Sequence, residues 1–196
     1  NDEVGVYAYR LSPVLVGPGN VENFFNNPGQ YASTTYVIDA GAFNYCEDEI
    51  ESYPERSILT PHFGEFKRLF LSIDDPDVVC EISINIIKMI QKVIDKRIII
   101  LKSFNTFIIT KDMVYIMDKG PSLLATAGTG DVLSGILVSL LSQGYSRLEA
   151  SILGTYLHAE AANYYMDNIS KDGMTASDLI DCIPFAFNKL REQSVN

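Results

Sequence analysis

The chain has 196 residues, 47% of them apolar and 20% charged. This composition suits one globular domain with a sizeable core and excludes a disordered chain. The formal net charge of −10 and the sequence pI of about 4.6 argue against partners that are nucleic acids or anionic membranes. A nucleotide ligand remains compatible with this charge, because local amides and one lysine suffice to bind phosphate.

Neither a membrane segment nor a secretory signal is expected. No stretch reaches the roughly 18 apolar residues of a membrane span, and the first ten residues do not resemble a signal peptide. Cys46, Cys80 and Cys182 match neither a zinc pattern nor a disulfide framework, and we expect reduced thiols. Together these features predict a cytoplasmic protein.

The first half of the chain alternates short β-rich runs with helical runs. A weak helical pattern covers residues 21–31, and strands are predicted at residues 13–16 (PVLV), 35–39 (TYVID) and 57–60 (SILT). Asp75 followed by Pro76 is a favourable helix start, with an N-cap acceptor and a proline at the first helical position. We therefore predict a helix from this point to about Ile94.

The second half contains a predicted hairpin followed by helices. Strands are predicted at residues 97–101, 106–110 and 113–117, with the last two joined at Lys111-Asp112. Capping patterns are formed by Ser146 with Glu149 and by Thr175 with Asp178. Helices are predicted over residues 128–143, 147–166 and 176–191, and the apolar run of the first (VLSGILVSLL) indicates burial on most sides.

The alternation of elements predicts a single α/β domain over residues 1–196, with a largely parallel sheet covered by helices on both faces. In open α/β sheets the ligand crevice lies beyond the carboxyl ends of the strands. The segments that follow such ends are residues 17–19, 39–44 and 61–65, and a glycine turn at residues 128–131 is a fourth candidate.

The sharpest chemical feature is the run TAGTGD at residues 126–131, directly before an apolar helix. Small residues let the backbone approach a phosphate, and free amides at a helix N-terminus stabilise its charge. Asp131, in the first turn, could accept a proton from a hydroxyl held there. The alternative is an ordinary tight turn whose aspartate only complements the helix dipole.

Two further segments carry weaker signals. In LTPHFGEF, at residues 59–66, His62 and Glu65 could contact a phosphate, a magnesium-bound water or a substrate hydroxyl, or they could simply cap a helix. In LKSFNT, at residues 101–106, Lys102 could serve as a point charge for phosphate, or it could be a surface lysine in a polar turn. His158, in the apolar run TYLHAEAA, is predicted to be a buried, hydrogen-bonded histidine rather than a catalytic one.

Taken together, these segments resemble the NAD(P)H-hydrate dehydratases of the ribokinase-like superfamily. LTPHFGEFKRL is similar to the family's LTPHPGEFARL, and LATAGTGDVLSGILVSLLSQG is similar to its LATGGTGDVLAGIIAGLLAQG. VLVGPG, VIDAGAFN, ILKSFNT, YLHAEAA and TASDLIDCIPFAF follow in the family's order, so that the resemblance runs from about Val14 to Phe187. It implies a three-layer α/β/α fold, and also that a stretch preceding GPG in the family is absent.

The resemblance also implies a function. Family members repair hydrated NADH and NADPH by phosphorylating the added hydroxyl with ADP or ATP and magnesium, after which phosphate leaves. Carried over by position, Asp131 is the base and, with His62 and Gly19, contacts the hydrated dinucleotide. Glu65 orders magnesium, if necessary through water. The remaining nucleotide contacts would be Lys102, Ser103, Phe104, Asn105, Thr106, Gly128, Thr129 and Gly130.

Partners implied by the resemblance are a second copy of the chain in a homo-oligomer and an NAD(P)H-hydrate epimerase.

Two other functions stay open. The glycine turn alone also fits a ribokinase-like kinase for a small alcohol or a vitamin precursor. Departures from the family pattern, such as Gly41 after Asp39-Ala40 where the family has a second aspartate, and Ser103 where it has glycine, motivate a nucleotide-binding protein without catalysis.

Overall fold

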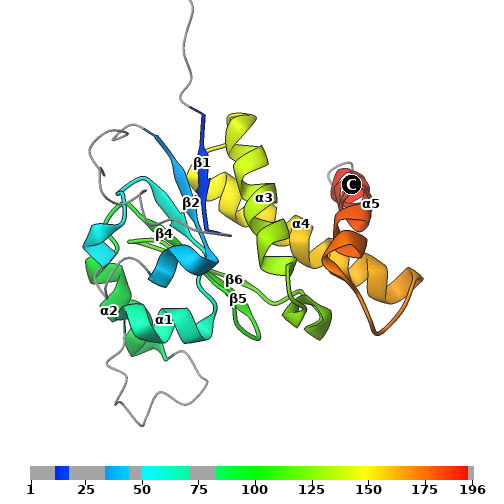
Figure 1. Cartoon of the computed structure of the whole chain (residues 1–196), viewed down its shortest axis with the longest axis horizontal. Coiled ribbons are helices and arrows are strands. Elements are labelled where there is room, and N and C mark those ends of the chain that lie inside the picture. The colour runs from blue at the N-terminus through cyan, green and yellow to red at the C-terminus, as the bar shows by residue number, and fades with distance from the viewer. Residues whose placement is uncertain (1–11, 18–33, 45–49, 71–82, 194–196) are drawn as a thin grey trace, which may run out of the picture.

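The structure is a computed structural model that describes residues 12–17, 34–44, 50–70 and 83–193 (Figure 1). Within these residues one sheet has six strands, which lie side by side in the order of the chain. The strands are β1 (Val14–Val16), β2 (Tyr36–Ile38), β3 (Ser57–Leu59), β4 (Ile98–Leu101), β5 (Thr106–Ile109) and β6 (Val114–Met117). The first four are mutually parallel, and β5 and β6 are added as antiparallel neighbours.

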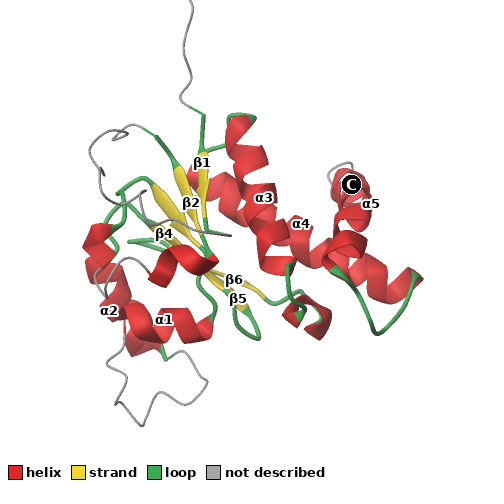
Figure 2. Ribbon diagram, viewed as in Figure 1, coloured by secondary structure: helices red, strands yellow, loops and turns green. Residues whose placement is uncertain are grey.

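Helices cover both faces of the sheet, as Figure 2 shows. The helices α1 (Phe63–Phe70) and α2 (Ile84–Val93) lie on one face. On the other face lies α3 (Thr129–Ser142), with α4 (Arg147–Asn168) beside it and α5 (Ala176–Gln193) packed against α4. This is the three-layer α/β/α architecture predicted from the sequence. None of the described helices is both long enough and apolar enough to cross a membrane.

The strand residues alternate between two apolar cores. Tyr36 and Ile38 of β2 pack on the side of α1 and α2, whereas Val37 packs on the side of α3. All three side chains are at most 2% exposed, because helices cover both faces of the sheet. A parallel sheet covered in this way needs apolar residues at successive positions, and the run YVI meets that need.

Most predicted elements are confirmed to within a few residues, including the hairpin between β5 and β6 and the three C-terminal helices. The helix predicted from Asp75 to Ile94 is not continuous, because it is interrupted at Ser83. Ser83 is extended and caps α2 by accepting a hydrogen bond from the Ile86 amide, so the helix begins at Ile84. Asp75 and Pro76, like the predicted helix at residues 21–31 and the cysteines Cys46 and Cys80, lie outside the described residues.

Short 3-10 helices at Ala40–Asn44, Ile50–Ser52 and Ser122–Ala125 were not predicted, since segments of three to five residues carry too little periodicity to be recognised. The capping box of α4 is confirmed. The Ser146 side chain accepts from the Glu149 amide at 3.2 Å, and the Glu149 carboxylate accepts from the Ser146 amide at 2.8 Å.

Candidate active site

The loops that carry the predicted site meet at the carboxyl edge of the parallel strands. Asp39 follows β2, and the segment containing His62 follows β3. Lys102 follows β4, and its amide donates to the Pro61 carbonyl at 2.9 Å. Because the carboxyl ends of parallel strands lie on one edge of the sheet, three segments that are distant in sequence converge there.

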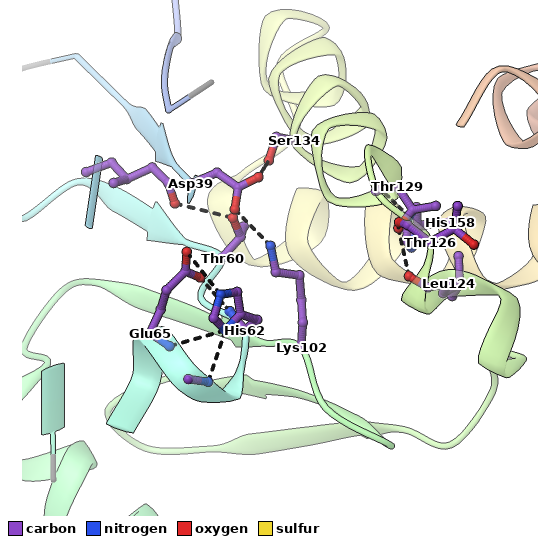
Figure 3. Close-up of polar contacts among 12 residues, drawn as sticks. Asp39, Thr60, His62, Glu65, Lys102, Leu124, Thr126, Thr129, Ser134 and His158 are labelled. Atoms are coloured by element: carbon purple, nitrogen blue, oxygen red, sulfur yellow. Dashed lines mark hydrogen bonds and ion pairs between the residues drawn. The ribbon is translucent and has the colours of Figure 1, made fainter. Parts of the chain in front are cut away.

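Asp39 and Lys102 form an ion pair at the centre of this edge (Figure 3). The Lys102 Nζ donates to Asp39 Oδ1 at 2.8 Å, and the Ser134 hydroxyl of α3 donates to Asp39 Oδ2 at 2.8 Å. Burial alone would raise the pKa of Asp39. The Lys102 charge and the hydrogen bonds from Lys102, Thr60 and Ser134 together outweigh it and hold the pKa of Asp39 below its usual 3.8. Asp39 is therefore a buried carboxylate that stays ionised.

The first turn of α3 lies directly against this pair. A Cβ atom placed on Gly130 would lie 3.2 Å from the Lys102 Nζ and 3.7 Å from Asp39 Oδ2. The Thr129 amide donates to the Thr126 carbonyl at 3.3 Å, whereas within the described part of the chain the amides of Gly130 and Asp131 have no acceptor. Unpaired amides at a helix N-terminus, with a lysine ammonium beside them, form a site suited to an anion.

The glycine turn before α3 is held by its own backbone conformation and by hydrogen bonds to the segment that precedes it. Gly128 adopts φ 85°, the left-handed conformation that favours glycine. The Thr129 hydroxyl lies 2.7 Å from the Leu124 carbonyl oxygen and 2.8 Å from that of Thr126, so its single proton is shared between them. The turn is thus held in one conformation by contacts to the preceding 3-10 helix.

His158 of α4 also holds this turn. Its Nε2 lies 2.8 Å from the Thr129 carbonyl oxygen, and because a carbonyl only accepts, Nε2 carries the proton. Burial, despite the opposing effect of this hydrogen bond, lowers the pKa of His158 to about 4. The prediction of a buried, hydrogen-bonded histidine is confirmed.

His62 and Glu65 form a helix cap. The His62 Nδ1 accepts from the amides of Gly64 at 3.0 Å and Glu65 at 3.2 Å, while the Glu65 carboxylate accepts from the His62 amide at 2.8 Å. This reciprocal pattern is a capping box in which histidine replaces serine or threonine. The predicted alternative of a helix cap is therefore present, and the Glu65 side chain that takes part in it is buried.

The capping role leaves the outer part of His62 free to contact a ligand, because 60% of its side chain is exposed. The Glu65 carboxylate has one oxygen bound by the His62 amide and the other 3.4 Å from the His62 Nε2. Its contacts are those of a cap, and they do not favour direct coordination of magnesium. Across the described residues, no three histidine, cysteine or acidic side chains gather as they would around a metal ion.

A cavity of about 670 Å³ joins these segments. Its wall brings together His62, the loop between β4 and β5, the 3-10 helix before α3, the glycine turn and one side of α4. The Thr155 hydroxyl on α4 is buried without a hydrogen-bond partner among the described residues, and Thr155 lines the cavity. At the rim, the Phe104 side chain is 99% exposed. A volume of this size is in the range of small-ligand sites.

The structure brings most of the predicted site residues together. His62, Lys102, Ser103, Phe104, Thr106, Thr129 and Gly130 line the cavity. Asp131 is exposed on the first turn of α3, next to Gly130, but it is not itself one of the residues that line the cavity. Gly128 is the N-cap of α3 and Asn105 lies in the same loop as Lys102. Gly19 lies outside the described residues.

Sequence reasoning missed Asp39 and Ser134 as site residues. A signal for Asp39 was available, since it is an acidic residue directly after a buried strand, at the edge where ligands bind. Ser134 gave no such signal, because a serine within an apolar helix is also compatible with a bond to its own helix backbone.

A protein-family model described as NAD(P)H-hydrate dehydratase matches residues 7–185. The chain belongs to the NAD(P)H-hydrate dehydratase family. The bifunctional NAD(P)H-hydrate repair enzyme Nnr of Helicobacter pylori is 34% identical over 178 residues, which are 88% of this chain and 37% of that relative. The ADP-dependent (S)-NAD(P)H-hydrate dehydratase of Neisseria meningitidis is 29% identical over 170 residues, which are 82% of this chain and 56% of that relative.

Solved structures of similar proteins have the same fold. Bacillus subtilis YxkO, described as a putative kinase, matches with a TM-score of 0.74 and 26% identity over 89% of this chain and 65% of that one. The ADP/ATP-dependent NAD(P)H-hydrate dehydratase of Bacillus subtilis, co-crystallised with ATP and Mg²⁺, matches with a TM-score of 0.71 and 26% identity over 89% of this chain and 63% of that one. The chain therefore spans about a third to two thirds of the length of its relatives.

Proposed function

We propose that this protein dehydrates hydrated NADH and NADPH at the expense of ADP or ATP. The observation that carries the proposal is that His62, the loop after β4 and the glycine turn before α3 line one and the same cavity. The cavity is thus lined by three motifs that are far apart in the sequence. Together these motifs resemble the family. Relatives named as ADP- or ATP-dependent NAD(P)H-hydrate dehydratases support the choice of reaction.

In this proposal the nucleotide phosphates lie against the first turn of α3. The free amides of Gly130 and Asp131 would bind phosphoryl oxygens, and the Lys102 ammonium would supply a positive charge beside them. The buried Thr155 hydroxyl offers a further polar contact inside the cavity. These groups fit a nucleotide, whereas nothing among the described side chains forms a magnesium cage, and no step is assigned to the metal ion.

Phe104 is proposed to contact the nucleotide base. The phenyl ring of Phe104 is exposed where it lines the cavity, and none of the described residues covers it. Stacking of a base on such a ring contributes roughly 1–3 kcal/mol. Ser103, Asn105 and Thr106 belong to the same loop and complete the proposed nucleotide contacts.

Asp131 is proposed as the base. Its carboxylate would take the proton of the hydroxyl on the hydrated nicotinamide ring while the hydroxyl oxygen bonds to the terminal phosphorus of the nucleotide. The bond between that phosphorus and its bridging oxygen would break, and the shortened nucleotide (AMP from ADP, or ADP from ATP) would leave with the electron pair. Subsequent cleavage of the carbon–oxygen bond releases phosphate, and loss of a ring proton restores the dihydropyridine. The exposed position of Asp131 beside Gly130 leaves this carboxylate accessible to such a substrate.

The remaining roles are extensions of the same proposal. His62, with most of its side chain exposed at the cavity, and Gly19 would contact the hydrated dinucleotide, and Glu65 would act on magnesium only through water. The protein would work in the cytoplasm as a homo-oligomer. An epimerase for the same substrate would be its functional partner, in keeping with relatives named as bifunctional repair enzymes.

The test is recovery of the absorbance of reduced nicotinamide when the chain is mixed with NADH hydrate, Mg²⁺ and ADP or ATP. Asp131→Asn should lower the rate on the order of 10²–10⁴-fold while its circular dichroism stays that of the wild type. No recovery with either nucleotide from folded protein would refute the proposal. A stable phosphorylated product without restored absorbance would instead favour a small-molecule kinase.

A further inference from the structure

The Asp39–Lys102 ion pair is asymmetric in its exposure. The Asp39 side chain is 1% exposed, whereas the Lys102 side chain is 25% exposed and lines the cavity. The two charges therefore face different surroundings. The carboxylate lies among β2, the residues after β3 and α3 (Figure 3), while the Lys102 side chain forms part of the cavity wall.

The ammonium keeps hydrogen-bonding capacity for a ligand. A lysine ammonium has three donors, and among the described residues the Lys102 ammonium donates to one acceptor, Asp39 Oδ1. The Nζ would lie 3.2 Å from a Cβ on Gly130, so it is next to the free amides of the first turn of α3. A phosphate bound by those amides would also be within reach of the remaining ammonium donors.

We propose that Asp39 is a positioning residue that holds the Lys102 ammonium beside the first turn of α3 for phosphate binding. The inference rests on the proposed function only in assigning the phosphate to a nucleotide. Asp39 itself does not touch the ligand in this account. Its carboxylate fixes one donor of the ammonium, so that less side-chain freedom of Lys102 is lost when an anion binds.

Ser134 strengthens the assignment, because it fixes the carboxylate itself. Its hydroxyl occupies Asp39 Oδ2 at 2.8 Å, which leaves Oδ1 for Lys102. The carboxylate is thus oriented from α3, the same helix whose first turn would bind the phosphate. If the Asp39–Lys102 ion pair served only to stabilise the fold, the Lys102 ammonium would not need to lie at the wall of the cavity.

The experiment is a double-mutant cycle with Asp39→Asn, Lys102→Met and the combination of the two. The dissociation constants of inorganic pyrophosphate and ADP are measured by calorimetry. Loss of a charged hydrogen bond to phosphate should weaken binding on the order of 10-fold or more in Lys102→Met, and Asp39→Asn should weaken it by a similar factor. In the Lys102→Met background, Asp39→Asn should then change the affinity less than about twofold, since an effect exerted through Lys102 vanishes with it.

A matched control is Glu160→Gln. Glu160 is also a buried carboxylate, 3% exposed, paired with the half-exposed Lys189, but the pair lies between α4 and α5. This change should lower the stability of the fold without changing the affinity for pyrophosphate. If Asp39→Asn does not fold, Asp39→Glu provides the same test, because it keeps the charge but displaces the carboxylate by one methylene.

The inference is overturned if Asp39→Asn, or Asp39→Glu in its place, leaves the affinity unchanged or raises it. It is equally overturned if the loss of affinity persists in the Lys102→Met background, or if the wild-type chain binds neither probe. Failure of the proposed function would give a different result from failure of this inference. The chain would then bind pyrophosphate with the expected coupling between Asp39 and Lys102, but it would not restore reduced nicotinamide.

Discussion

The stability of the fold should fall in mild acid because of His158. This side chain is 7% exposed and its neutral imidazole donates to the Thr129 carbonyl. Burial lowers the pKa of His158 from 6.5 to about 4. In the unfolded chain the histidine takes up a proton near its ordinary pKa, so between these two values the unfolded state binds more protons than the folded one. The folded state therefore loses stability as the pH falls through this window.

The size of the effect follows from the shift. A difference of one pKa unit corresponds to about 1.36 kcal/mol, and the fall from 6.5 to about 4 corresponds to roughly 3 kcal/mol. Most of it should be lost by pH ~5 and the rest near pH ~4. A typical domain has a free energy of unfolding of about 5–15 kcal/mol, so this loss would be a substantial fraction of the total stability.

The measurement is urea unfolding followed by circular dichroism at several pH values between neutrality and the pKa of the buried group. His158→Gln is the comparison, because its amide can still donate to Thr129 but does not titrate. The wild type should lose on the order of 3 kcal/mol more than the variant over this range. Parallel losses in the two proteins would show that His158 does not carry the effect, and that the reasoning about its burial is wrong.

Three further changes test other features of the structure. Phe104→Ala should weaken the binding of ADP roughly 5-fold to 150-fold if the base stacks there, and leave the binding of pyrophosphate unchanged. Because the chain has no tryptophan, Phe104→Trp also provides a single tryptophan whose fluorescence ADP should quench. Gly128→Ala should lower the free energy of unfolding by about 1–2 kcal/mol, since φ is 85° there. Gly135→Ala in the same helix, where an added Cβ meets nothing within 4 Å, should instead be neutral or stabilising. Ser146→Ala should cost about 0.5–2 kcal/mol in chemical unfolding through loss of the cap of α4.

The elements could be predicted because local patterns determine them. The continuous apolar runs at β2 and β4 required a sheet covered on both faces, and the capping residues Ser146 and Glu149 fixed the start of α4. The start of α2 was missed because Asp75-Pro76 and Ser83 are both suitable caps, and local sequence does not rank two such candidates. Only the conformation of Ser83 shows where the described helix begins.

Part of the site could also be predicted from local sequence patterns. The turn before α3 and the segment around His62 could be found as motifs, each contained within a few residues. The pairing of Lys102 with Asp39 could not, because nothing in either segment specifies the other. It is determined by the order of strands in the sheet, which places the ends of β2 and β4 at one edge with β3 between them.

The long sequence separations in the ion-pair cluster have a consequence for assembly. Asp39 and Lys102 are 63 residues apart, and Asp39 and Ser134 are 95 apart. Contacts of this range form only when the parallel strands and the helix on their far face have all come together, so the anion pocket cannot exist in a partly folded intermediate that lacks any of them. Binding of an anion there would then be coupled to the folding of the whole domain, and at a ligand concentration of about 100 times its dissociation constant it would stabilise the native state by about 2.7 kcal/mol.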